Sequence, residues 1–135
     1  MSRSGYNDDC EDIALYRGQV ASAIRGRRGQ AFLRELVEAL DALPQHALIY
    51  HELRSGNGVC ALGAVGAKRG VNLESLDPDD ADTLSGVFGI AHQLVREIEY
   101  ENDEGFYGAY REVETPEHRW QRIRDWAVKH IRNEP

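Results

Sequence analysis

The chain has few of the residues that define several protein classes. It holds two cysteines in 135 residues, which excludes a small secreted fold held by disulfides and indicates reduced thiols. It contains no Gly-Lys-Ser/Thr sequence, which excludes a P-loop. Its longest apolar stretch covers residues 59–67, whereas a membrane-spanning helix needs about 20 residues. We therefore expect a cytoplasmic protein with no membrane segment.

Positive charge is scarce in the middle of the chain. Residues 71–118 carry a net charge of −11, whereas residues 1–70 and 119–135 carry +1 and +3. The acidic middle repels nucleic acid phosphates, so we expect no direct nucleic-acid binding. A partner with a basic surface is expected instead.

The spacing of apolar residues predicts a mainly α fold, a single compact domain of five or six helices with at most one short β-hairpin. Residues 1–8 are expected to form a flexible N-terminus, and residues 9–135 the helical domain. Helices are expected over 9–24, 30–42, 59–69 and 90–101, after an N-cap at Asp77 and from Thr115 onward, with a short strand or hairpin arm over 47–54.

A glycine-rich stretch, "RSGNGVCALGAVG", covers residues 54–66. Its "GNGVCA" fits the loose dinucleotide pattern G-x-G-x-x-A, but no βαβ unit follows it. We therefore expect a tight turn that leads into a buried helix of small residues. Cys60 fits that helix as a small buried hydrophobic side chain.

An alternative function makes Cys60 a nucleophile. A thiolate at the first turn of a helix is stabilised by the helix dipole and the free backbone N–H groups. A cysteine enzyme also needs a base. His51 is one candidate for that role, and Asn102 with Asp103 is another if the fold brings them near Cys60.

Two groups of acidic residues are the candidates for partner binding. The first, in "DPDDAD", consists of Asp79, Asp80 and Asp82. The second, in "REIEYENDEG", consists of Glu97, Glu99, Glu101, Asp103 and Glu104. Like charges three or four residues apart on a helix repel, and acids near a helix C-terminus are unfavourable. Glu97, Glu99 and Glu101 are therefore expected to form either a solvated face or a surface that meets positive charge. For Asp103 the alternative is that it turns the chain together with Asn102, with Arg119 or Arg122 neutralising part of the group.

No metal ion or cofactor is expected. The five histidines are scattered, without the spacing of a helical metal site. "DPDDAD" lacks the glycine and the glutamate that a calcium-binding loop needs, so its acids are better explained as a helix start.

Three segments, "VCALGAVG", "FGIAHQLVREIEYENDEG" and "ETPEHRWQRIRDWAV", together resemble a family of small bacteriophage and prophage proteins. The shared features are a Cys-x-Leu-Gly segment (Cys60, Leu62, Gly63) and a later Asn-Asp-Glu motif (Asn102, Asp103, Glu104). The resemblance implies a small accessory protein of phage origin and no particular chemistry. Many such proteins bind and block a host component, including the nucleic-acid-guided complexes of bacterial immunity.

The expected function is thus that of an acidic, non-enzymatic inhibitor. It would block a basic, nucleic-acid-binding surface of a bacterial defence complex in the host cytoplasm, as an anti-CRISPR protein or nucleic-acid mimic does. The small cysteine-dependent enzyme is the alternative.

Overall fold

The computed structural model describes residues 13–105 and 114–132. The expected flexible N-terminus, residues 1–8, lies outside them. Within the described part the chain is mainly helical and forms a single compact domain with one short two-stranded sheet, as the sequence predicts. None of the described helices has the length and apolar character to cross a membrane.

The described part of the chain forms six helices, two short strands and one 3-10 turn. They are α1 (Ile13–Arg25), α2 (Arg27–Ala42), β1 (Arg54–Ser55), β2 (Gly58–Val59), α3 (Ala61–Arg69), the 3-10 turn η1 (Leu73–Ser75), α4 (Ala81–Phe88), α5 (His92–Glu104) and α6 (Pro116–His130). The expected strand was placed too early, because the antiparallel pairs are Arg54 with Val59 and Ser55 with Gly58.

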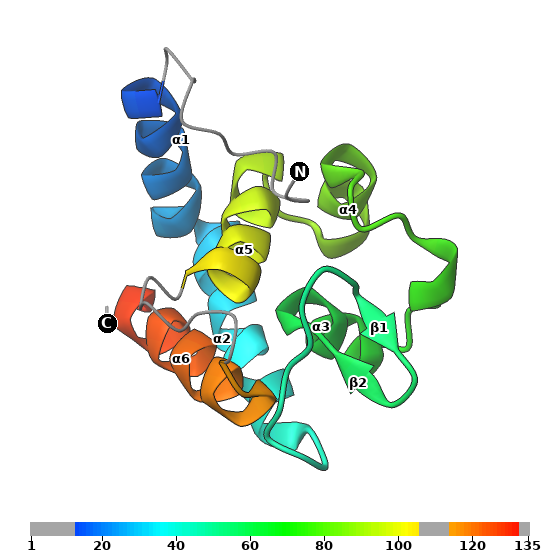
Figure 1. Ribbon diagram of the computed structural model, residues 1–135. Helices are drawn as coiled ribbons and strands as arrows, with labels where there is room; N and C mark the ends of the chain where they lie inside the picture. The colour runs from blue at the N-terminus through cyan, green and yellow to red at the C-terminus, as the bar shows by residue number, and fades with distance from the viewer. Residues whose placement is uncertain (1–12, 106–113, 133–135) are drawn as a thin grey trace.

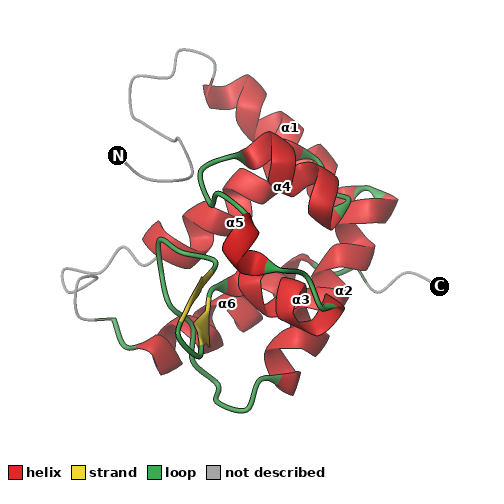
Figure 2. Ribbon diagram, turned by 90° about the vertical axis from the view of Figure 1, so that its right-hand side faces the viewer, coloured by secondary structure: helices red, strands yellow, loops and turns green. Residues whose placement is uncertain are grey.

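Two helices organise the packing. α2 contacts α1, α3 and α6, while α5 contacts α1, α3, α4 and α6. In Figure 1, α5 lies in the middle of the molecule between α1 and α4. Figure 2 shows the hairpin at the end of the molecule away from α1. The core between these helices is built from leucine, isoleucine, valine and phenylalanine side chains, including the α2 stripe Phe32, Leu33, Leu36 and Leu40.

Helix ends follow local capping chemistry. Thr115 is the N-cap of α6 with Pro116 at the first position, as predicted. The predicted N-cap of α4 is wrong by three residues, because Asp80 accepts the Thr83 N–H at 3.1 Å. Asp77 instead closes a turn before the helix by accepting the Asp79 N–H at 2.9 Å.

The small-residue helix α3 lies in the interior. Its residues from Ala61 to Gly66 are all buried, and Leu62 contributes a fully buried side chain. A Cβ atom built on Gly63 would overlap the backbone carbonyl of Leu53. Glycine at position 63 therefore allows α3 to lie closer to the backbone at Leu53, just before the hairpin, than a residue with a side chain would.

Candidate functional site

The acidic residues of α5 do not form one exposed face. Glu97 and Glu99 are only 2% and 1% exposed, and burying a carboxylate requires groups that replace its hydration. For Glu97 that group is Arg17 of α1, whose guanidinium nitrogens lie 2.5 and 3.0 Å from the two carboxylate oxygens. The expectation of an exposed acidic face is therefore corrected for Glu97 and Glu99. Both lie in the interior, and Glu97 joins α5 to α1.

Asn102 is a buried connector between α5 and two other segments. Its side-chain oxygen accepts the Ala61 N–H at 3.0 Å, in the first turn of α3. Its amide nitrogen donates to the Ile49 carbonyl at 2.9 Å and to Asp103 Oδ1 at 2.8 Å. Asn102 thus holds the start of α3 and the segment before the hairpin against α5.

Asp103 also turns inward, with its side chain 1% exposed. Its Oδ1 accepts the His51 N–H at 3.2 Å, and its Oδ2 lies 3.8 Å from the His51 ring Nδ1. His51 has φ of 67°, a left-handed conformation that costs a non-glycine residue energy. The Asp103 carboxylate therefore stabilises the turn at His51 and does not form part of an outer acidic surface.

Glu101 and Glu104 are half-buried at the C-terminal end of α5. The pKa of Glu101 is raised, because burial disfavours its charged form and the nearby Glu97 carboxylate repels it. Arg122 of α6 donates to the backbone carbonyl of Glu101, so α6 satisfies the unfavourable negative end of α5. Two arginines from distant helices thus offset part of this unfavourable charge pattern, Arg17 at Glu97 and Arg122 at the last carbonyls of α5.

The three acids around the start of α4 are exposed, in contrast to those of α5. Together with Glu74 and Asp77, the residues Asp79, Asp80 and Asp82 form what we call the acidic segment, residues 74–82. Asp80 caps α4, and the hydrogen bonds from the Thr83 hydroxyl and N–H lower its pKa. In the described part of the chain no lysine or arginine forms an ion pair with this segment. The ring Nδ1 of His92 lies 4.0 Å from Asp82 Oδ1.

Cys60 is the N-cap of α3 and is 0% exposed. Its Sγ accepts the Gly63 N–H at 3.4 Å, and its own N–H donates to the Leu53 carbonyl at 3.1 Å. These contacts agree with the interpretation of Cys60 as part of the buried scaffold.

The residues of the alternative enzyme do come together in part. Asp103 bonds to His51, and Asn102 bonds to the residue that follows Cys60. A nucleophile also needs access to its substrate, and the Cys60 side chain is enclosed in the core. In this arrangement the network of Asn102 and Asp103 orders the backbone around the thiol without exposing it.

A basic surface lies where α1, α2 and the end of α6 meet, and the sequence analysis missed it. It consists of Arg25, Arg27, Arg28, Arg34 and Arg132, which line two adjoining hollows of about 520 and 410 Å³. No described aspartate or glutamate lines either hollow. The signal in the sequence was "RGRRG", because arginines at the start of a helix oppose the helix dipole.

Gln30 holds this surface together. Its amide nitrogen donates to the carbonyls of Ile24 and His130, both at 2.9 Å, and its oxygen accepts the Arg132 N–H at 2.7 Å. One buried side chain thus fixes the ends of α1 and α6 beside α2.

The described residues contain no group of three or more histidine, cysteine, aspartate or glutamate side chains arranged to hold a metal ion. Comparison of the chain with protein families, with curated proteins and with solved structures finds no match. The features of the molecule that bear on function are its charged surfaces and the placement of the candidate residues.

Proposed function

We propose that this protein is a non-enzymatic binding protein whose acidic segment docks on a basic surface of a partner. The observation that carries the proposal is the exposure of five carboxylates within residues 74–82. The sequence has no lysine or arginine between Arg69 and Arg96. The negative charge of the five carboxylates therefore faces solvent and is little compensated by nearby cations. The acidic residues of α5, by contrast, are mostly buried or half-buried and in contact with other parts of the fold.

Electrostatic complementarity of this kind favours fast and selective association with a positively charged surface. A nucleic-acid-binding surface offers the highest density of positive charge, because it is built to contact phosphates. If the chain is of phage origin, as its sequence leads us to expect, the partner belongs to the bacterial host. The proposed role is therefore inhibition of a host nucleic-acid-binding or defence complex by occupation of its basic surface.

The test compares two charge-neutralised variants. Asp79→Asn/Asp82→Asn removes two exposed charges and leaves the Asp80 cap intact. Glu52→Gln/Asp125→Asn removes two exposed charges elsewhere and is the matched control. Bound proteins are captured from a bacterial lysate, identified by mass spectrometry, purified and tested for association with each variant and for competition by DNA and RNA.

The proposal predicts a stoichiometric complex that nucleic acid displaces. Its association rate should fall with ionic strength and fall further in Asp79→Asn/Asp82→Asn than in the control. Equal binding by the two double variants would exclude the acidic segment as the docking surface. Catalytic turnover that is lost in Cys60→Ala would favour the alternative enzyme.

A further inference from the structure

We propose that the hollow beside Arg28 binds the phosphate group of a small organic phosphate, such as a mononucleotide. The site is formed by α1, the start of α2 and the start of α5, and it is separate from the acidic segment. The proposal goes beyond the proposed function and does not depend on it.

The first argument is the position of the arginines. Arg27 and Arg28 occupy the first turn of α2, where the backbone N–H groups already place positive charge. This turn contains no acidic residue, and its N-cap, Gly26, provides no side-chain hydrogen bond. Two cations are therefore held where an anion would be favourable.

The other arginines of the basic surface have structural explanations. Arg25 lies in the last turn of α1, where a cation is favourable. Arg34 donates to the Arg132 carbonyl at 2.7 Å. Within the described residues, neither Arg27 nor Arg28 has an ion-pair partner, so the folded chain leaves their charge uncompensated there.

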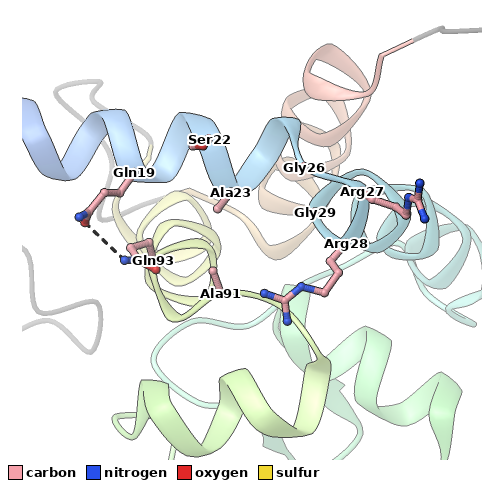
Figure 3. A pocket seen from close by; sticks show the side chains of 9 residues that line it. All are labelled: Gln19, Ser22, Ala23, Gly26, Arg27, Arg28, Gly29, Ala91 and Gln93. Carbon is pink, nitrogen blue, oxygen red and sulfur yellow. Dashed lines mark hydrogen bonds between the residues drawn. The ribbon is translucent and has the colours of Figure 1, made fainter.

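The second argument is the geometry of the hollow. Figure 3 shows the Arg28 side chain extending toward Ala91, whereas the Arg27 side chain points away from Ala91. Arg27 also lines the second hollow. On the far side of the first hollow, Gln19 and Gln93 are linked by a hydrogen bond of 3.3 Å. Between Arg28 and these two glutamines the hollow is lined by small residues, namely Ser22, Ala23, Gly26, Gly29 and Ala91. A ligand in this hollow therefore meets the guanidinium of Arg28, the neutral amides of Gln19 and Gln93, and small side chains.

The chemistry of these groups favours phosphate. A guanidinium presents a planar pair of N–H donors that matches two phosphate oxygens. The neutral amides of Gln19 and Gln93 can donate to or accept from the remainder of a polar ligand. A volume of about 520 Å³ is within the usual range for small-molecule sites.

A small ligand fits better than a long polyanion. The whole chain has a net charge of −7, which opposes the approach of an extended nucleic acid at low ionic strength. A single phosphate group needs only the guanidinium of Arg28 and the positive field around the start of α2. We therefore assign the site to a small phosphate and use an oligonucleotide as the competing source of the same group.

The experiment uses the full chain with four probes: inorganic phosphate, adenosine 5′-monophosphate, adenosine and a short single-stranded oligonucleotide. Binding is followed by titration of the backbone amide resonances at constant ionic strength. Adenosine 5′-monophosphate should shift the resonances of Arg28, Gly29 and Ala91, and inorganic phosphate should shift the same set more weakly. Adenosine, which lacks the phosphate, should leave them unchanged.

Arg27→Gln/Arg28→Gln should weaken binding by about tenfold or more, since charge-assisted hydrogen bonds are lost. Its melting temperature should be unchanged or higher, because a like-charge conflict at the helix start is removed. Arg54→Gln/Lys68→Gln, which alters two exposed cations outside both hollows, is the control and should keep wild-type affinity. Arg28→Lys should give an intermediate affinity, since it keeps the charge without the planar fork.

Three results would overturn the assignment. The first is the absence of resonance shifts with adenosine 5′-monophosphate at about 1 mM, the Kd of a weak ligand. The second is equal affinity of the two double variants for adenosine 5′-monophosphate. The third is that adenosine shifts the resonances as much as adenosine 5′-monophosphate does. Tighter binding of the oligonucleotide, with shifts that extend to Arg34 and Arg132, would replace the small ligand by a nucleic acid. Asp79→Asn/Asp82→Asn should bind the probes like wild type, so failure of this site is distinguishable from failure of the acidic segment.

Discussion

Replacing Gly63 with alanine should destabilise the protein, although alanine is the better helix former. Gly63 is in the interior helix α3, and a Cβ atom there would overlap the backbone carbonyl oxygen of Leu53. That oxygen accepts the Cys60 N–H at 3.1 Å. The added methyl group therefore cannot be accommodated by rotation of a side chain and must displace a hydrogen-bonded backbone segment.

The expected magnitude follows from three contributions. Overpacking of a close-packed site costs about 1–3 kcal/mol. Weakening the hydrogen bond between Cys60 and Leu53 costs about 1 kcal/mol. Exchange of glycine for alanine within a helix favours folding by about 1 kcal/mol. The free energy of unfolding should therefore fall by about 2 kcal/mol, with a fall in Tm of about 6–8 °C.

The assay is urea denaturation followed by circular dichroism, with Gly66→Ala as the matched control. Gly66 is in the same helix, but its added Cβ would meet the end of the Leu73 side chain, which can rotate away. The control should change stability by less than about 1 kcal/mol. If Gly63→Ala retains the wild-type midpoint, or if the two variants are equally destabilised, the close approach of α3 to Leu53 is not a determinant of stability.

Three further predictions concern the residues around α5 and α3. Asn102→Ala should lower the free energy of unfolding by about 2–4 kcal/mol, because the buried Ala61 N–H and the partly buried Ile49 carbonyl lose their hydrogen bonds to Asn102; urea denaturation measures this. Glu101→Gln should raise stability at pH 7 but not near pH 4. Because the pKa of Glu101 is raised in the folded protein, its contribution to stability is fully present below the ordinary pKa of a glutamate and is lost as pH rises through the folded pKa. Thermal denaturation across this pH range measures the difference. Cys60 should react with a thiol reagent only after denaturant is added, and rapid reaction in the folded protein would revive the cysteine enzyme.

The helical fold was predictable because its signals are local. The α2 stripe repeats within its own helix, and Thr115 with Pro116 marks the start of α6 within two residues. The hairpin was misplaced because its two-residue strands carry almost no alternating pattern. The start of α4 was predicted at Asp77, whereas Asp80, the same residue type three positions later, accepts the Thr83 N–H and caps the helix.

The candidate site was harder to predict because the environment of a charge depends on partners far away in the sequence. Glu97 reads as a residue of a repulsive helix face, yet its partner Arg17 is 80 residues earlier in the chain. Arg34 and Arg132 share a surface although 98 residues separate them. The net charge of a continuous segment of sequence therefore does not show which of its charges are paired in the folded protein. An acidic group can be predicted as exposed from the sequence where, as in residues 74–82, no lysine or arginine lies nearby in the chain and its local role, such as the helix cap at Asp80, leaves the carboxylate at the surface.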